Sequence, residues 1–376
     1  MGQQLQRARR ERGWSQAKLI HEIEHYARRH LLTIASTASL RVYVSEWENG
    51  RRTVAPPYTG ILRALLGLTD AELFDRPSPG ALPAADGYDE LLSRIDAAGS
   101  LSAEMVSTFQ SQTELLRNVD RQMGAANLVD QMTGHLRALE DALTFAILPS
   151  TRTPIAQALA GAATLAAWQA LDVGAVERAW RNYELAKRAA IEGNAPMFLA
   201  HATAEQAYVL SDAGRPELAI QLAREAQTTG RGHSSARLTA WLHAVEAELC
   251  AKAGLASEAR HALDLAAQSL PAGGEARDPD MPSVFLNAGH LDRWRGNVLA
   301  LLGDDDAVNS LYQALDTLDP TFVRASAGLR CDLAQAHLAR QEFDQAAEHL
   351  RQARLIASRT GSVRHLKRIE RLTGSL

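Results

Sequence analysis

The sequence predicts an all-α protein with a small helical domain first and a long array of helical hairpins after it. Two observations support this fold class. Hydrophobic residues make up 46% of the chain but aromatic residues only 5%, because Ala and Leu, two of the strongest helix formers, supply most of the apolar content. In addition, one pattern of small residues repeats along the C-terminal part of the chain, which is typical of stacked helical units.

The charge distribution separates the first domain from the rest. The 376 residues carry a formal net charge of −4, yet residues 1–60 contain ten Lys/Arg and five Asp/Glu. This segment therefore has a charge of +5, and the remainder about −9. A basic segment on an acidic chain indicates an anionic partner for the first domain.

Cysteine usage and hydropathy indicate a cytoplasmic protein. Cys250 and Cys331 form no metal-binding or disulfide pattern, which fits a reducing compartment. The N-terminal end shows no apolar signal-peptide region. The longest apolar stretch, residues 154–176, contains Gln157, Gln169 and Asp172, so a buried helix is expected there and no membrane partner.

Residues 1–75 are expected to form a domain of short helices. The first helix stops near Gly13, and Ser15 is well placed to cap the second. A polar segment of small residues, TIASTAS, follows the second helix, and Asn49-Gly50 is a stop signal for the third. The second, third and fourth helices are expected at residues 15–31, 40–48 and 58–68.

Three further segments complete the expected organisation. Residues 76–87 are rich in Pro and Gly and are interpreted as a linker. Residues 88–150 are expected to be a helical connector with two helices, around 100–118 and 125–148. Residues 151–376 form the repeated array.

The repeat consists of Ala pairs seven residues apart. The pairs begin 40, 40, 48 and 39 residues from one another, and most follow a Gly-containing turn. A small residue also stands seven residues upstream of each turn, where it lets two antiparallel helices approach closely. Such hairpins cannot bury their apolar faces alone and stack into an α-solenoid. The pairs are Ala179/Ala186, Ala219/Ala226, Ala259/Ala266, Ala307/Ala314 and Ala346/Ala353, and the upstream residues are Ala167, Ala207, Ala247, Gly296 and Ala334.

These units resemble the tetratricopeptide repeat. AGRPELAIQLAREA and RQEFDQAAEHLRQARLIA look like its turn and second helix. The spacings exceed the roughly 34-residue consensus, so longer helices or loops are expected. A non-repeating helical bundle is the alternative.

The first domain resembles the helix-turn-helix of phage-repressor-type regulators, the XRE family. The segment between its two helices is longer than in compact repressors, which looks like actinobacterial members that carry a tetratricopeptide-like C-terminal part. The matching residues are Ser15, Gln16, Ala17, Leu19 and Ile20, then Val44, Ser45, Trp47, Glu48, Asn49 and Gly50.

The resemblance implies a set of DNA contacts on the third helix and around it. Arg41 would bind guanine, Val42 a thymine methyl group and Glu46 the cytosine amino group. Phosphate contacts would position the domain without reading sequence. Base-reading positions fall at Arg41, Val42, Ser45 and Glu46, and phosphate-contacting positions at Gln16, Tyr43, Arg51 and Arg52.

The stretch His21–His25 (HEIEH) fits H-E-x-x-H, the helical zinc signature of many peptidases. At 100° per residue, Leu19, Ile20 and Ile23 form the apolar face, and His21 and His25 fall on the opposite, solvent-facing side. No third His follows at the spacing of such enzymes. We therefore expect no metal, no cofactor and no enzyme, and a zinc peptidase using His21, Glu22 and His25 is kept as an alternative.

The first helix of each repeat unit is expected to line a concave surface. Aromatic and charged residues fall on that side, amid many Ala and Leu, and Arg293 there is suited to a carboxylate. We interpret this surface as a groove for a peptide or small-molecule effector; the alternative is that some of its residues only pack between helices. The candidate residues are Trp168, His201, Tyr208, Trp241, Glu248, His290, Arg293, Asn297 and Gln335.

Together these features predict a transcriptional regulator that binds double-stranded DNA as a homodimer and senses a ligand or a protein partner through its solenoid. A single small domain contacts few phosphates, so a dimer on a two-fold site is expected. The alternative is an interaction scaffold whose helix-turn-helix domain does not bind DNA.

Overall fold

The computed structural model describes residues 2–30, 32–49, 52–55, 57–67, 86–273, 277–278 and 281–376. Every regular element in these ranges is an α-helix; the one β-type pairing is an isolated bridge between Arg277 and Phe285. This confirms the all-α prediction. None of the described helices combines the length and apolar character needed to cross a membrane.

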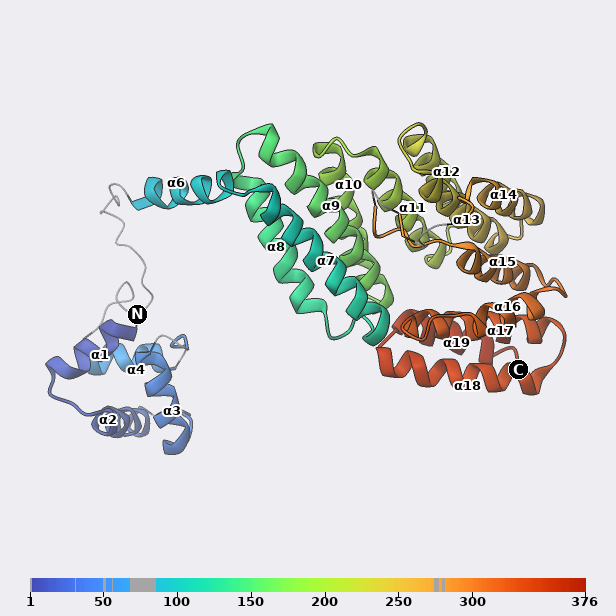
Figure 1. Cartoon of the computed structure of the whole chain (residues 1–376). Coiled ribbons are helices and arrows are strands. Elements are labelled where there is room, and N and C mark those ends of the chain that lie inside the picture. Colours follow the sequence, from blue (N-terminus) through green and yellow to red (C-terminus); the bar gives the residue numbers. More distant parts are fainter. Residues whose placement is uncertain are drawn as a thin grey trace. The chain divides into compact units, whose positions relative to one another are not determined.

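Contacts divide the chain into two units, Met1–Glu90 and Leu91–Leu376 (Figure 1). The predicted linker, residues 76–87, lies outside the described residues except for its last two, which begin α6. Because α7 and α8 pack on α9, the segment named a connector above contributes helices to the second unit.

The first unit contains four described helices. Ser15 caps the second, accepting a 3.1 Å hydrogen bond from the Lys18 N–H. The third begins at Thr37, three residues before the predicted start, because Ser36 caps it through the Ser39 N–H. The helices are α1 (Gly2–Glu11), α2 (Gln16–Arg29), α3 (Thr37–Glu48) and α4 (Tyr58–Leu66).

A single apolar core holds these four helices together. Leu19 and Ile23 of α2 are buried in it, as the helical phase predicted, and so are Val44 and Trp47 of α3. The Tyr58 hydroxyl at the start of α4 accepts a 2.8 Å hydrogen bond from the Ala35 N–H. This bond fixes the end of the long segment between α2 and α3.

From α6 onward the structure describes fourteen helices, of which α6 crosses the boundary at Glu90 and the others lie in the second unit. Three of them cover the region where two were predicted, since α6 precedes the expected pair. They are α6 (Asp86–Gly99), α7 (Ala103–Met123), α8 (Val129–Phe145), α9 (Pro149–Asp172), α10 (Val176–Glu192), α11 (Pro196–Asp212), α12 (Pro216–Gly230), α13 (Ala236–Lys252), α14 (Ala256–Ser269), α15 (Ala288–Leu302), α16 (Ala307–Asp316), α17 (Val323–Ala339), α18 (Phe343–Thr360) and α19 (Val363–Thr373).

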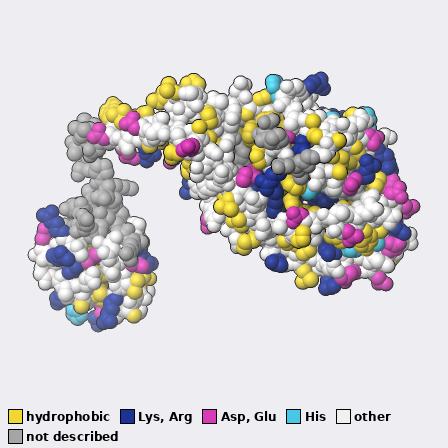
Figure 2. All heavy atoms as spheres, in the orientation of Figure 1, with side chains coloured by type: hydrophobic (Ala, Val, Ile, Leu, Met, Phe, Trp, Pro, Cys, Tyr) yellow, Lys and Arg dark blue, Asp and Glu magenta, His cyan; other side chains and the backbone are white. Residues whose placement is uncertain are grey.

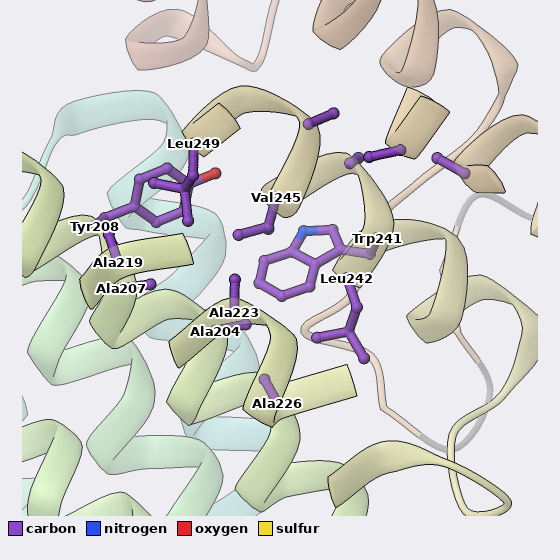
Figure 3. Packing of buried hydrophobic residues seen from close by; sticks show 14 of the residues in the cluster. Ala204, Ala207, Tyr208, Ala219, Ala223, Ala226, Trp241, Leu242, Val245 and Leu249 are labelled. Atoms are coloured by element: carbon purple, nitrogen blue, oxygen red, sulfur yellow. The ribbon is translucent and has the colours of Figure 1, made fainter. Parts of the chain in front are cut away.

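Helices α9 to α18 form five antiparallel hairpins, stacked as the repeat predicted (Figure 1). All ten paired Ala residues are buried, and Ala side chains of α11 and α12 face Trp241 and Val245 of α13 (Figure 3). At Gly296 even a methyl group would lie 2.7 Å from a Leu311 side-chain carbon, so any other residue there would displace Leu311 between α15 and α16. The turn without Gly places Gln341 at φ 60°, in the left-handed region.

The last helices of the second unit return to its first ones. Helix α7 contacts α9, α17 and α18, and α19 contacts α9. The turn after α7 meets the turn after α18 so closely that a Cβ at Gly124 would lie 2.1 Å from the Thr360 carbonyl oxygen. The solenoid is therefore closed, with its inner helices around a common space.

Candidate functional site

Helix α3 divides into a buried and an exposed face. Leu40, Val44 and Trp47 are in the core, whereas Arg41 is exposed and Val42 is 53% exposed. The two remaining predicted base-reading residues, Ser45 and Glu46, are half-buried beside them. The predicted set therefore shares one accessible side of a helix that the core holds by its other side.

The residues predicted to contact phosphate have partners within the unit. The Arg52 guanidinium lies 3.7 Å from the ring centroid of Tyr43, and its Nη1 is 3.2 Å from Glu46 Oε2. Tyr43 itself is half-buried against Trp47 and Tyr58. Arg51 lies outside the described residues.

Gln16 donates a 2.9 Å hydrogen bond from Nε2 to Glu48 Oε2. Glu48 also accepts two hydrogen bonds from Arg9, one from Nε at 2.5 Å and one from Nη2 at 2.9 Å. This pair lies in the buried interior of the unit. Burial raises the pKa of Glu48, but the bonds from Arg9 and Gln16 outweigh it and hold that pKa below its ordinary value. Sequence reasoning missed this pair because 39 residues separate its members and no local spacing marks it.

The HEIEH histidines lie where the helical phase predicted. His21 and His25 are exposed, while Ile20, just before them, and Ile23, between them, face the core. Glu22 is paired with Lys18 at 2.7 Å, and that hydrogen bond lowers the pKa of Glu22. Within the described ranges, no group of three His, Cys, Asp or Glu side chains is arranged to hold a metal ion.

The inner helices of the second unit surround a cavity of about 1470 Å³. Lys, Arg and apolar side chains surround a hollow on the visible face of this unit (Figure 2). All the residues predicted for the groove line this cavity, so the structure brings them together; whether they bind a ligand stays a prediction. They are Trp168, His201, Tyr208, Trp241, Glu248, His290, Arg293, Asn297 and Gln335.

Glu248 organises one part of the wall. It accepts hydrogen bonds from the Tyr208 hydroxyl at 2.9 Å and from Trp294 Nε1 at 3.1 Å, and it pairs with Lys252 at 2.7 Å. Burial raises the pKa of Glu248, but the charge and hydrogen bond of Lys252 outweigh burial, and the net result is a pKa lowered to about 2. This carboxylate stays ionised and fixes the two aromatic side chains.

Glu205 has a different environment on the neighbouring helix. Its carboxyl group accepts a 3.3 Å hydrogen bond from the Tyr183 hydroxyl and lies 3.6 Å from His201 Nε2. Burial raises the pKa of Glu205 to about 7 and lowers that of His201 to about 3. His201 is therefore neutral at pH 7 and supplies no balancing charge.

Helix α19 contributes cations to the cavity that the sequence did not reveal. Arg364 pairs with Asp212 of α11 through Nε at 2.6 Å and lies 5.2 and 5.4 Å from the ring centroids of Trp168 and Tyr208. Arg368 pairs with Asp332 at 2.7 Å, and Asp332 accepts a 2.6 Å hydrogen bond from Asn297. Their position depends on closure of the solenoid, which no repeat spacing encodes.

The fold and these sites define an all-α protein with a helix-turn-helix unit and a tetratricopeptide-like solenoid around a cavity. No protein-family model and no curated protein matches the chain.

Two solved structures are similar in architecture. One is Bacillus thuringiensis PlcR in complex with the peptide PapR7 and DNA, at 13% identity and a TM-score of 0.39, covering 83% of this chain and 92% of that one. The other is a Rap protein complexed with Competence and Sporulation Factor, at 15% identity and a TM-score of 0.48, covering 96% of this chain and 97% of that one. These likenesses concern helical architecture alone.

Proposed function

We propose that the chain is a DNA-binding regulator, and not an enzyme, whose solenoid cavity binds an effector. The observation that carries this proposal is the division of α3: a buried face anchored by Val44 and Trp47, and an accessible face with Arg41 and Val42. A recognition helix needs both, because its anchors set the angle at which the other face enters a major groove.

The chemistry of the accessible face suits base edges. Arg41 has the planar donor pair that guanine accepts, and Val42 offers an apolar contact for a thymine methyl group. The ion pair between Glu46 and Arg52 is partly exposed and therefore weak, so a base or a phosphate can replace either partner. The unit is small, so tight binding would require two copies on a two-fold site.

The effector part of the proposal rests on the cavity. Its volume of about 1470 Å³ exceeds the roughly 300–1,000 Å³ of pockets for drug-sized ligands, so it has room for a short peptide. Indole rings, a buried carboxyl group whose pKa is raised to about 7 and several cations offer both apolar and polar contacts. A ligand that binds two curvatures of the solenoid with different affinity would shift the protein between two states.

Selection of bound sequences from random DNA tests the proposal, using the full chain at low salt. A two-fold site, and a steep loss of affinity as salt rises, are the expected results. Arg41→Ala should weaken binding to the selected site by about 1–3 kcal/mol and relax preference at one base pair. Arg7→Ala is the matched control, since Arg7 is 79% exposed on α1 and pairs with Glu11.

Two outcomes would overturn it. If the chain enriches no sequence and shows no DNA affinity at low salt, the scaffold interpretation replaces the regulator. If Arg41→Ala and Arg7→Ala have equal effects on a selected site, α3 does not read the bases.

A further inference from the structure

One part of the cavity wall combines two arginines with three aromatic rings. The guanidinium of Arg121, on α7, lies 5.4 Å from the ring centroid of Phe285 and 5.1 Å from that of Phe322. The His290 ring, at the start of α15, is 4.6 Å from Phe285 and 5.4 Å from Phe322. Arg293 follows one turn later on α15, and all five side chains line the same cavity.

The arginines of this wall differ in their partners. Arg117 pairs with Glu114 at 3.1 Å, and Arg324 pairs with Asp120 at 2.7 Å. Among the described residues, neither Arg121 nor Arg293 has an ion-pair partner, and Nε of Arg293 is buried without a hydrogen bond. Burial, followed by the charges of Arg117 and other nearby arginines, lowers the pKa of Arg121 to about 10, so it remains charged at neutral pH. Two unneutralised guanidinium groups in a closed wall favour an anionic ligand group, and their planar forks match a carboxylate.

His290 adds a hydrogen-bond acceptor to this part of the wall. Asn287 Oδ1 accepts the backbone N–H of His290 at 2.9 Å, which identifies this atom as the amide oxygen. The same oxygen lies 2.7 Å from Nδ1 of the His290 ring, so Nδ1 carries the proton. Burial and the charges of Arg293 and Arg121 lower the pKa of His290 to about 4, and the ring is neutral at pH 7. Its Nε2 is then an acceptor, and it is buried without a partner.

A carboxylate and an N–H donor therefore fit side by side here. The end of a peptide has both, since the last backbone N–H stands next to the terminal carboxylate. We infer that the effector is bound by its free C-terminal end: the carboxylate on Arg121 and Arg293, the last N–H on His290 Nε2, and the last side chain against Phe285 and Phe322. This inference rests on the proposed function, and it also fits a single N-acylated amino acid.

The test begins with the full-length protein and two pools of random hexapeptides, one with free carboxyl ends and one with C-terminal amides. Peptides retained on the immobilised protein are identified by mass spectrometry, and the best is measured by calorimetry as acid and as amide. Amidation should weaken binding about tenfold to hundredfold, the usual effect of losing a charge-assisted hydrogen-bonded pair. N-acetyl amino acids matching its last residue form the arm that separates a peptide from a single acylated amino acid.

Variants assign the effect to this wall. Arg121→Gln and Arg293→Gln should weaken the acid as much as amidation does, and should leave the affinity of the amide unchanged. His290→Phe should match the loss caused by replacing the last amide with an ester. Arg260→Gln is the control, because Arg260 pairs with Asp304 at 2.7 Å outside the cavity lining. Melting temperatures of all variants confirm that they are folded.

The failures are distinguishable. If hexapeptides bind the cavity, with affinity lost in Trp241→Ala, but acid and amide bind equally, the subsite is wrong and the proposed function stands. If neither pool nor any N-acetyl amino acid binds, the subsite falls together with the effector part of the proposed function.

Discussion

The Ser362 hydroxyl donates a 2.6 Å hydrogen bond to Asp172 Oδ1, although 190 residues separate the two. Both side chains are buried, at the turn before α19 and at the end of α9. The same hydroxyl accepts a 2.7 Å bond from His365 Nδ1. Arg324 lies 3.7 Å from Asp172 and pairs more closely with Asp120 of α7. These contacts connect helices from both ends of the solenoid and give the cavity its closed wall.

Closure can be tested where the backbones approach most closely. Gly124 has φ +83°, and a Cβ there would meet the Thr360 carbonyl carbon at 2.8 Å as well as its oxygen at 2.1 Å. Gly124→Ala should therefore cost more than about 2 kcal/mol of unfolding free energy, measured by urea denaturation. It should also increase hydrogen exchange in α18 and α19 before the rest of the unit opens.

Gly134→Ala is the matched control for this change. Gly134 is inside α8, and a Cβ there meets nothing within 4 Å. That substitution should stabilise the protein by about 0.5–1 kcal/mol, because Ala is the better helix former. Equal effects at the two glycines would mean that the turns after α7 and α18 do not meet.

The buried pair in the first unit leads to a second prediction. Glu48→Gln leaves the Arg9 guanidinium buried without an opposite charge, and it should cost about 3–5 kcal/mol. Hydrogen exchange of α3 in the full chain should accelerate about a hundredfold or more, while exchange in α13 stays unchanged. Arg9 also donates a 2.7 Å bond to the Trp14 carbonyl oxygen, which alone cannot neutralise its charge.

Two further variants show whether charge is the cause. The double variant Arg9→Met with Glu48→Leu removes both charges and should recover most of the lost stability. Glu11→Gln removes an exposed carboxylate from the same unit and should change stability by less than about 0.5 kcal/mol. If the double variant is as unstable as Glu48→Gln, packing rather than charge explains the loss.

The sequence predicted well the part of the cavity wall that the repeat units form. Trp168, Tyr208 and Glu248 stand 40 residues apart, as do His201 and Trp241, so one register places them all on corresponding faces. The helical phase within a unit and the period between units are enough to place these residues on the inner face, and both can be read from the sequence.

The rest of the wall depends on how far the solenoid turns. Arg121 is on a helix before the repeats, and Arg364 is on the helix after them. They reach the cavity because the small rotations between successive hairpins add up to a closed ring, and no single spacing in the sequence measures that sum. The start of α3 was missed for a simpler reason, since Ser36 is one of several adjacent residues that can cap a helix.

The protonation state of Glu205 leads to the last prediction, a pH dependence. Its pKa in the folded protein is about 7, against an ordinary value of 4.5, because its side chain is only 14% exposed. Below pH 4.5 the carboxyl group is protonated in both folded and unfolded chains and has no effect. Between pH 4.5 and 7 the unfolded chain loses this proton while the folded chain keeps it, so Glu205 destabilises the fold increasingly as pH rises, by up to about 3 kcal/mol above pH 7.

Gln has no such proton, so the stability of Glu205→Gln relative to the natural chain should increase between pH 5 and pH 8, as measured by urea denaturation. Glu177→Gln, at an exposed position on α10, should show no such trend. A Glu205→Gln difference that is the same at both pH values would mean that Glu205 is ionised in the folded protein, with a cationic partner in the cavity.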